Sequence, residues 1–131
     1  MIEVAAAVIT SGNMVFLSSR PLDKPPAGWE FPGGKLEAGE TVQSAVIREL
    51  QEELDWQVTA GEILYQLHRG NLILHFIRCT PLPGSTPTAR EGQSFRWVEI
   101  TPEIPAELLA NDIEFWKIFS ARPEFSGKFA K

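Results

Sequence analysis

Cysteine is almost absent from this chain, and that scarcity limits the kinds of protein it can be. Cys79 is the single cysteine among 131 residues, so no internal disulfide can form. The chain therefore lacks the disulfide framework on which many small secreted domains depend. Because Cys79 lies in an apolar stretch, we expect a small buried side chain rather than a nucleophile.

Long apolar runs and an excess of basic side chains are also missing. No segment approaches the roughly 18 apolar residues of a membrane-spanning helix, and residues 1–10 lack the basic start of a signal peptide. We therefore expect a cytoplasmic protein without a membrane partner. The formal net charge of -5 argues against binding to a nucleic acid polymer, which requires a basic face. A phosphate substrate is compatible with this charge if a divalent cation lies between acidic side chains and phosphate oxygens.

The order of the expected secondary-structure elements predicts the fold class. Strands are expected at residues 4–9, 14–18, 57–67, 72–79 and 95–100, with helices at residues 41–54 and from about 111 to 119. The turn signal at residues 11–13 predicts that the first two strands form a hairpin. Strands, a helix, further strands and a terminal helix predict a mixed α/β or α+β sandwich. The length suits one domain over residues 1–131.

The predicted helix at residues 41–54 carries three carboxylates on one face. At about 100° per residue, Glu49, Glu52 and Glu53 fall together, away from the apolar stripe of the helix. Like charges at this spacing destabilise a helix, and the helix dipole disfavours anions near its C-terminus. A divalent cation bound by carboxylate oxygens would stabilise the arrangement. A solvated acidic face is the alternative interpretation.

Residues that flank this helix favour a cation site. Gly33 and Gly34 form a turn whose bare backbone can approach a ligand or offer a carbonyl oxygen. Glu40 lies at the start of the helix. Arg48 directly precedes Glu49 and can hold a carboxylate in place by a forked hydrogen bond.

The spacing of these residues resembles the Nudix box, G-x5-E-x7-R-E-U-x-E-E-x-G-U, in which U is a bulky apolar residue. Gly34, Glu40 and residues 48–53 match every fixed position of the first 20 residues. Trp56 fills the final apolar position, and Asp55 replaces the last glycine. That glycine is expected to form a left-handed cap after the helix, a conformation that aspartate tolerates better than most residues. The substitution of aspartate for this glycine therefore affects the stability of the cap and leaves the carboxylates in place.

The resemblance implies a Nudix fold, an α/β/α sandwich with a mixed β-sheet, and hydrolysis of a diphosphate linkage in a nucleotide. It also implies a bound Mg²⁺, with Mn²⁺ as the alternative. Carried over position by position, the metal ligands would be the three helix carboxylates together with the Gly33 carbonyl. Arg48 would orient a ligand carboxylate and Lys35 would contact phosphate.

A catalytic base outside the box is common in this family. Glu91, in the loop just before the predicted strand at residues 95–100, is our candidate for this base and for a further metal ligand. Glu52 or Glu53 is the alternative base. The alternative for Glu91 is an exposed loop glutamate without a catalytic role.

Residues 29–35, Trp-Glu-Phe-Pro-Gly-Gly-Lys, resemble the MutT-like branch of the family, which hydrolyses nucleoside triphosphates to the monophosphate and pyrophosphate. In that branch Arg20 matches a position near the end of the second strand, and Phe31 would line the base pocket. Asn111 would read an oxidised guanine, because its amide offers a donor and an acceptor. A plain helix N-cap is the alternative for Asn111, and packing in the core is the alternative for Phe31.

The sequence therefore predicts a Nudix pyrophosphohydrolase that acts on 8-oxo-dGTP or a related (deoxy)nucleoside triphosphate. Hydrolysis of CTP or modified pyrimidine nucleotides stays open, because those enzymes share the box. A dinucleotide or sugar-nucleotide pyrophosphatase often carries extra segments, for which this chain has little room. A non-catalytic nucleotide-sensing Nudix domain is the alternative from another class, although such domains usually lose the helix glutamates. We expect a monomer or a weak homodimer.

Overall fold

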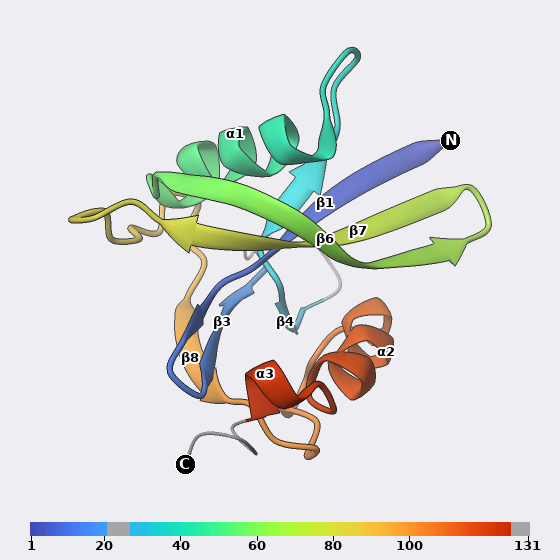
Figure 1. The fold of residues 1–131 in the computed structure, drawn as a ribbon. Helices are drawn as coiled ribbons and strands as arrows, with labels where there is room; N and C mark the ends of the chain where they lie inside the picture. Colours follow the sequence, from blue (N-terminus) through green and yellow to red (C-terminus); the bar gives the residue numbers. More distant parts are fainter. Residues whose placement is uncertain (21–26, 127–131) are drawn as a thin grey trace.

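The computed structural model describes residues 1–20 and 27–126, whose path is drawn in Figure 1. In chain order the elements are β1 (Ile2–Val8), β2 (Thr10–Ser11), β3 (Met14–Ser19), β4 (Trp29–Glu30), β5 (Gly33–Lys35), α1 (Val42–Leu54), β6 (Val58–Arg69), β7 (Leu72–Pro81), β8 (Phe95–Glu99), α2 (Ala110–Phe119) and α3 (Pro123–Ser126). None of the helices within these ranges is long and apolar enough to cross a membrane.

The first sheet combines parallel and antiparallel strands in the order β5-β1-β7-β6. β1 is parallel to β7, with Ala5 opposite His75, and antiparallel to β5, with Ala5 opposite Gly34. β6 and β7 form a long antiparallel hairpin. The predicted mixed sheet is therefore confirmed.

β3 is the centre of the second sheet and pairs with β2, β4 and β8. The predicted hairpin of the first two strands is wrong in one respect, because β1 belongs to the other sheet and only the short β2 pairs with β3. The reason is that β1 is apolar on both faces: Ala5 and Ala7 are buried on one side, and Ala6 and Val8 on the other. Such a strand is suited to the middle of a sheet that is covered on both sides.

Two apolar cores lie on opposite faces of the first sheet. Figure 1 shows α1 on one side of the sheet and α2 with α3 on the other. The core beneath α1 includes Leu50, Leu54 and Trp56. The opposite core is rich in aromatic side chains, and Phe115 of α2 stacks on Phe76 of β7 with ring centroids 4.1 Å apart. These layers confirm the predicted α/β/α sandwich.

The single cysteine behaves as the sequence predicts. Cys79 is buried beneath α1, and burial raises the pKa of its thiol to about 12. Because the thiolate is the nucleophilic form of cysteine, this residue is chemically inert at neutral pH.

Candidate active site

Hydrogen bonds at both ends of α1 fix where the helix begins and ends. Thr41 is the N-cap: its side chain accepts from Ser44 N–H, and the Ser44 hydroxyl accepts from Thr41 N–H, each at 3.0 Å. At the other end Asp55 adopts φ 49° and ψ 40°, the left-handed conformation predicted for this position. Its N–H donates to the Gln51 carbonyl at 3.1 Å, while its Oδ1 accepts from Gln51 Nε2 at 2.8 Å. The aspartate thus keeps the cap of the motif glycine.

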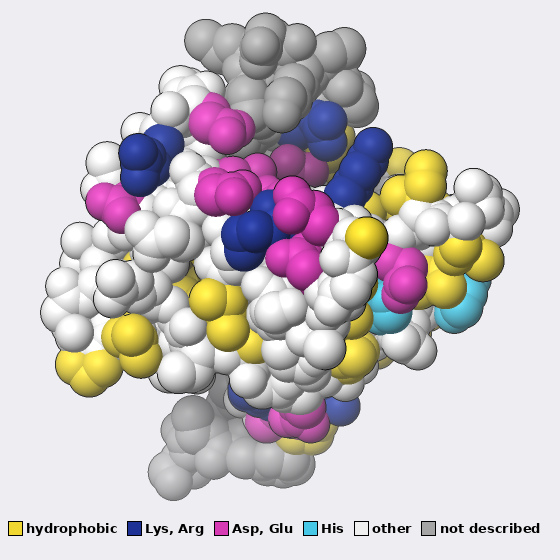
Figure 2. Space-filling model, turned by 90° about the horizontal axis from the view of Figure 1, so that it is seen from above, with side chains coloured by type: hydrophobic (Ala, Val, Ile, Leu, Met, Phe, Trp, Pro, Cys, Tyr) yellow, Lys and Arg dark blue, Asp and Glu magenta, His cyan; other side chains and the backbone are white. Residues whose placement is uncertain are grey.

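Arg48 joins the acidic side chains around α1. It donates a forked pair of hydrogen bonds to Glu40, from Nε at 2.7 Å and from Nη2 at 3.0 Å. Nη1 donates to Glu49 and to Glu52, each at 3.0 Å, and Nη2 also donates to the Lys35 carbonyl at 3.0 Å. The predicted forked bond is therefore present, with Glu40 as its partner. Seen from the α1 side, acidic and basic side chains lie together on this face (Figure 2).

These contacts set the charge state of Glu40. The hydrogen bonds from Arg48, together with one from Glu37 N–H, lower the pKa of Glu40 to about 2. Glu40 therefore stays anionic at neutral pH and holds Arg48 against the helix. The guanidinium of Arg48, held in this way, in turn orients the carboxylates of Glu49 and Glu52 through its hydrogen bonds.

The carboxylate of Glu49 lies directly against the backbone of Gly34. A Cβ atom at position 34 would lie 2.3 Å from Cδ of Glu49 and 2.5 Å from each of its oxygens. Burial raises the pKa of Glu49, against the opposing effect of Arg48. Gly33 is equally close to β1, since a Cβ there would lie 1.9 Å from the Ala5 carbonyl oxygen. A side chain at position 33 would thus collide with the backbone of β1, and one at position 34 with the carboxylate of Glu49.

Seven of the predicted site residues line one cavity of about 690 Å³. They are Arg20, Phe31, Gly33, Lys35, Glu49, Glu53 and Asn111. Arg48, Glu52 and Glu91, by contrast, are not among the described residues that line it. The side chain of Glu52 is 57% exposed and faces Arg48.

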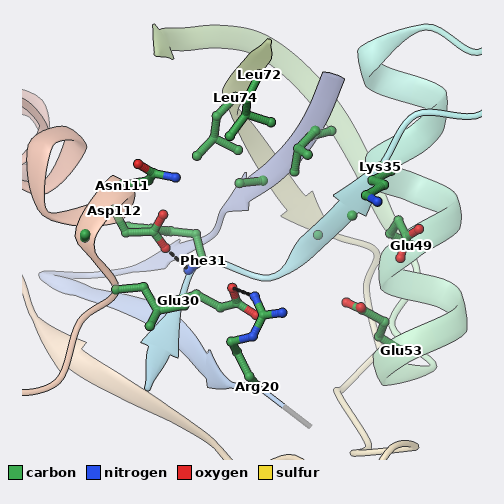
Figure 3. Close-up of a pocket in the computed structure, with 17 residues that line it drawn as sticks. Arg20, Glu30, Phe31, Lys35, Glu49, Glu53, Leu72, Leu74, Asn111 and Asp112 are labelled. Atoms are coloured by element: carbon green, nitrogen blue, oxygen red, sulfur yellow. Dashed lines mark hydrogen bonds and ion pairs between the residues drawn. The ribbon is translucent and has the colours of Figure 1, made fainter. Parts of the chain in front are cut away.

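The cavity has two chemically different ends, as Figure 3 shows. At one end Lys35 stands with Glu49 and Glu53 of α1. At the other end, the first turn of α2 presents Asn111 beside apolar side chains from β7. A ligand that fills this space has one end near charged groups and the other near an amide and apolar walls.

Asn111 is not a helix N-cap, so that alternative is wrong. α2 begins at Ala110, and Leu109 occupies the N-cap position without a side-chain hydrogen bond. The helix starts one residue earlier than expected because Leu109 is hydrogen-bonded to β4. Its N–H donates to the Trp29 carbonyl at 2.9 Å. Asn111 therefore lies in the first turn, where its side chain lines the cavity.

Phe31 takes part in the aromatic core and in the cavity wall. It is 3% exposed and makes edge contacts with Phe76 and Phe115, at centroid distances of 5.8 and 5.3 Å. Its N–H donates to Oδ2 of Asp112 at 2.9 Å (Figure 3). Phe31 therefore packs in the aromatic core and also lines the cavity, and a role in binding a base stays a prediction.

Sequence reasoning missed Asp112, Glu30 and Gln93. Asp112 lines the cavity next to Asn111, and burial raises its pKa from 3.8 to about 7. The signal in the sequence was an acidic residue directly after the candidate base-reading asparagine. Glu30 also lines the cavity and accepts from Arg20 Nη1 at 3.3 Å. Gln93 is a buried amide in the loop that carries Glu91.

Carboxylate and carbonyl oxygens at the acidic end of the cavity suit a hard divalent cation. Within residues 1–20 and 27–126, no three acidic, histidine or cysteine side chains are gathered into a metal site by themselves. Arg48 Nη1 is the shared partner of Glu49 and Glu52, which turns both carboxylates toward the guanidinium. Mg²⁺ commonly takes one or two carboxylates together with water and substrate phosphates, so the donor set fits this ion.

Comparison with known proteins identifies the family. Residues 1–116 match the NUDIX domain. The chain is 36% identical over 126 residues to CTP pyrophosphohydrolase of Escherichia coli (strain K12), covering 92% of this chain and 93% of that protein. It is 32% identical over 105 residues to 8-oxo-dGTP diphosphatase of the same organism, covering 76% of this chain and 81% of that protein. The solution structure of the E. coli ORF135 protein is similar to this one, with a TM-score of 0.73 and 32% sequence identity. The alignment covers all of this chain and 93% of the ORF135 chain.

Proposed function

This chain belongs to the NUDIX family, and from this premise we propose that it hydrolyses nucleoside triphosphates to the monophosphate and pyrophosphate. The predictions of a Nudix domain and of a hydrolase acting on phosphoanhydride bonds are confirmed by the family match and by relatives that are diphosphatases and pyrophosphohydrolases. The observation that carries the proposal is the cavity with its acidic end at α1 and its amide and apolar end at α2.

We propose that a divalent cation, Mg²⁺ or alternatively Mn²⁺, is held at the acidic end by the carbonyl of Gly33 and by one or two carboxylates at a time from the set Glu49, Glu52, Glu53 and Glu91. When bound, such a cation neutralises phosphate oxygens and activates a water for attack on phosphorus. Glu49 supports this assignment best, because the close approach of Gly34 and the hydrogen bond from Arg48 leave it little freedom. Preorganised charge of this kind is the main catalytic resource in phosphoryl transfer.

The phosphate chain of the substrate is placed at the acidic end by two cationic side chains. Lys35 and Arg20 both line the cavity, from β5 and from the end of β3. The ion pair of Arg20 with Glu30 orients the guanidinium within the cavity. Arg and Lys are the side chains that most often bind phosphate oxygens in proteins.

Glu91 is the proposed base because its loop is attached to the backbone of Glu53. Arg90 N–H donates to the Glu53 carbonyl at 3.1 Å, directly before Glu91 in the chain. Glu53 is the alternative base, since it lines the cavity itself. Glu52 fits less well, because its carboxylate accepts from Arg48 Nη1 at 3.0 Å and its side chain is 57% exposed.

The base of the nucleotide is proposed to lie against Leu72, Leu74 and Phe31, with Asn111 and Asp112 at its polar edge. The Asn111 amide offers a donor and an acceptor. A carboxyl whose pKa is about 7 offers a donor when protonated and only acceptors when ionised. Together they match the edge of an oxidised guanine, and also that of a cytosine.

CTP is a second candidate substrate for a specific reason. The alignment with the CTP pyrophosphohydrolase of E. coli covers 92% of this chain, whereas the alignment with the 8-oxo-dGTP diphosphatase of the same organism covers 76%. The site residues named above are compatible with either base. A free nucleotide as the partner, a cytoplasmic location and a monomeric or weakly dimeric state stay predictions.

The test is hydrolysis of a panel that contains 8-oxo-dGTP, dGTP, CTP, dCTP, 5-substituted pyrimidine triphosphates, a dinucleotide and a sugar nucleotide. Released pyrophosphate is measured for the triphosphates, and the released phosphate monoesters are measured for the dinucleotide and the sugar nucleotide. Each substrate is assayed with Mg²⁺ and with Mn²⁺, and chelator removes the metal in the control. We expect pyrophosphate from at least one triphosphate and dependence on the metal. Tight binding of a nucleotide without any hydrolysis would instead establish a sensing domain.

A further inference from the structure

The loop between β7 and β8 is attached to the C-terminal end of α1. Thr88 N–H donates to the Leu54 carbonyl at 2.6 Å, and Arg90 N–H donates to the Glu53 carbonyl at 3.1 Å. The last carbonyls of a helix have no partner within the helix, so the loop supplies their donors. The path of the loop is thereby fixed relative to the helix that carries the acidic side chains.

Gln93 is a buried amide in this loop, with 7% of its surface exposed. Its Nε2 donates to the Glu53 carbonyl at 3.2 Å, and its Oε1 accepts from Glu91 N–H at 2.8 Å. Gly92 between them has φ +75°, a left-handed conformation that lets the chain turn back on itself. One side chain thus joins the backbone of Glu91 to the backbone of Glu53.

The same segment is also attached to β3. Ser19 N–H donates to the Ser94 carbonyl, and Ser94 N–H donates to the Ser19 hydroxyl, each at 2.8 Å. Ser19 directly precedes Arg20, which lines the cavity. The loop is therefore held between α1 and β3 at its junction with β8.

We propose that Gln93 is a positioning residue that fixes the backbone of Glu91 against that of Glu53 and so sets the position of the Glu91 carboxylate relative to the acidic end of the cavity. The inference rests on the proposed function, in which Glu91 is the base and a metal ligand. Glu91 directly follows Arg90, whose N–H donates to the carbonyl of Glu53, and Glu53 lines this end of the cavity.

A purely structural role predicts that loss of the Gln93 amide lowers the stability of the fold, whereas a positioning role predicts that it displaces Glu91. Without the amide, the Glu53 carbonyl still accepts from Arg90 N–H. Glu91 is an exposed residue, so its N–H can bind water instead. Loss of the amide therefore changes the position of Glu91 more than it changes the stability of the fold.

The experiment is a double-mutant cycle on Gln93→Leu and Glu91→Gln, with the triphosphate that is hydrolysed best. We expect Gln93→Leu to lower kcat at least tenfold with KM little changed. In the Glu91→Gln background the same substitution should cause no further loss, since residues that act through one another are not additive. Gln43→Leu is the matched control, because the Gln43 amide also donates to a backbone carbonyl, that of Gly61 at 3.3 Å, but stands away from the loop.

A second measurement needs neither metal nor substrate. Amide hydrogen exchange by NMR on the metal-free protein should become at least tenfold faster at Glu91 in Gln93→Leu, while Leu50 in the core of α1 exchanges as in the wild type. Gln93→Met, which keeps the length of the side chain, replaces Gln93→Leu if the latter does not fold.

Three results would overturn the inference. They are unchanged kcat and exchange in Gln93→Leu, equal losses from Gln93→Leu with and without Glu91→Gln, and unchanged kcat in Glu91→Gln alone. In each case the wild-type enzyme still releases pyrophosphate, so the proposed hydrolysis of triphosphates stands, while unchanged kcat in Glu91→Gln also removes Glu91 as the base. If the wild type hydrolyses no triphosphate, the proposed function fails, and amide exchange still decides whether Gln93 holds the backbone of Glu91.

Discussion

Addition of one methyl group at position 34 tests how tightly the acidic end of the cavity is built. In Gly34→Ala the new Cβ would lie 2.3 to 2.5 Å from the three carboxylate atoms of Glu49. Ordinary contacts of a Cβ begin at 3.4 Å, so the carboxylate has to move by about 1 Å. The obstructing group is the end of a side chain and not backbone, so the fold can accommodate the change.

The expected loss falls on activity. A displacement of about 1 Å at a catalytic group costs roughly a hundredfold in rate. The stability lost with the partly exposed Arg48–Glu49 ion pair is about 0–1 kcal/mol. We therefore expect kcat/KM in Gly34→Ala to fall about a hundredfold, with a melting temperature close to that of the wild type.

Two other glycines provide matched controls. Gly61→Ala places a Cβ 3.5 Å from the Arg78 carbonyl, an ordinary contact, and should leave both activity and melting temperature unchanged. Gly33→Ala places a Cβ 1.9 Å from the Ala5 carbonyl, so β5 has to separate from β1 and the protein should melt at a clearly lower temperature. Wild-type kcat/KM in Gly34→Ala would refute the reasoning, because Glu49 could then move without consequence.

Four further predictions concern single side chains. Glu53→Gln should lower kcat at least a hundredfold without changing the circular dichroism spectrum, and wild-type turnover would show that Glu53 has no catalytic or metal-binding role. Asn111→Ala should lower the ratio of kcat/KM for 8-oxo-dGTP over dGTP, and an unchanged ratio would exclude a base-reading role. Burial raises the pKa of Asp112 from 3.8 to about 7, so between these pH values the folded state binds a proton more tightly than the unfolded state. The stability of the fold should therefore decrease by up to roughly 4 kcal/mol as the pH rises through this window. In Asp112→Asn, denaturant unfolding at pH 5 and pH 8 should show a smaller difference than in the wild type, and an equal difference would contradict the burial effect. Asp55→Gly should stabilise the protein by about 1 kcal/mol, because glycine adopts the left-handed cap without a steric cost, and a lower unfolding midpoint would show that the Asp55 side-chain contacts outweigh that cost.

Part of the site was predictable because it lies within one stretch of regular structure. The spacing of Glu49, Glu52 and Glu53 places them on one face of α1 wherever that helix packs. The left-handed conformation of Asp55 follows from the same local rules, since a helix end is capped by its next residue. The forked bond from Arg48 was also expected, although its partner is Glu40 and not one of the helix carboxylates.

The sequence by itself thus determined the identity of α1, its acidic face and the membership of the family, since hydrogen bonding along a helix and the match of spaced residues depend on near neighbours. Tertiary structure alone decided that β1 pairs in parallel with β7, about 70 residues further along the chain, and that Asn111 lies in the first turn of α2 rather than at its cap. It also decided that Asp112 is buried with a raised pKa and that Gln93 joins Glu91 to Glu53. These features depend on burial and on contacts between segments far apart in the sequence, whose free energy is available only once both cores have formed.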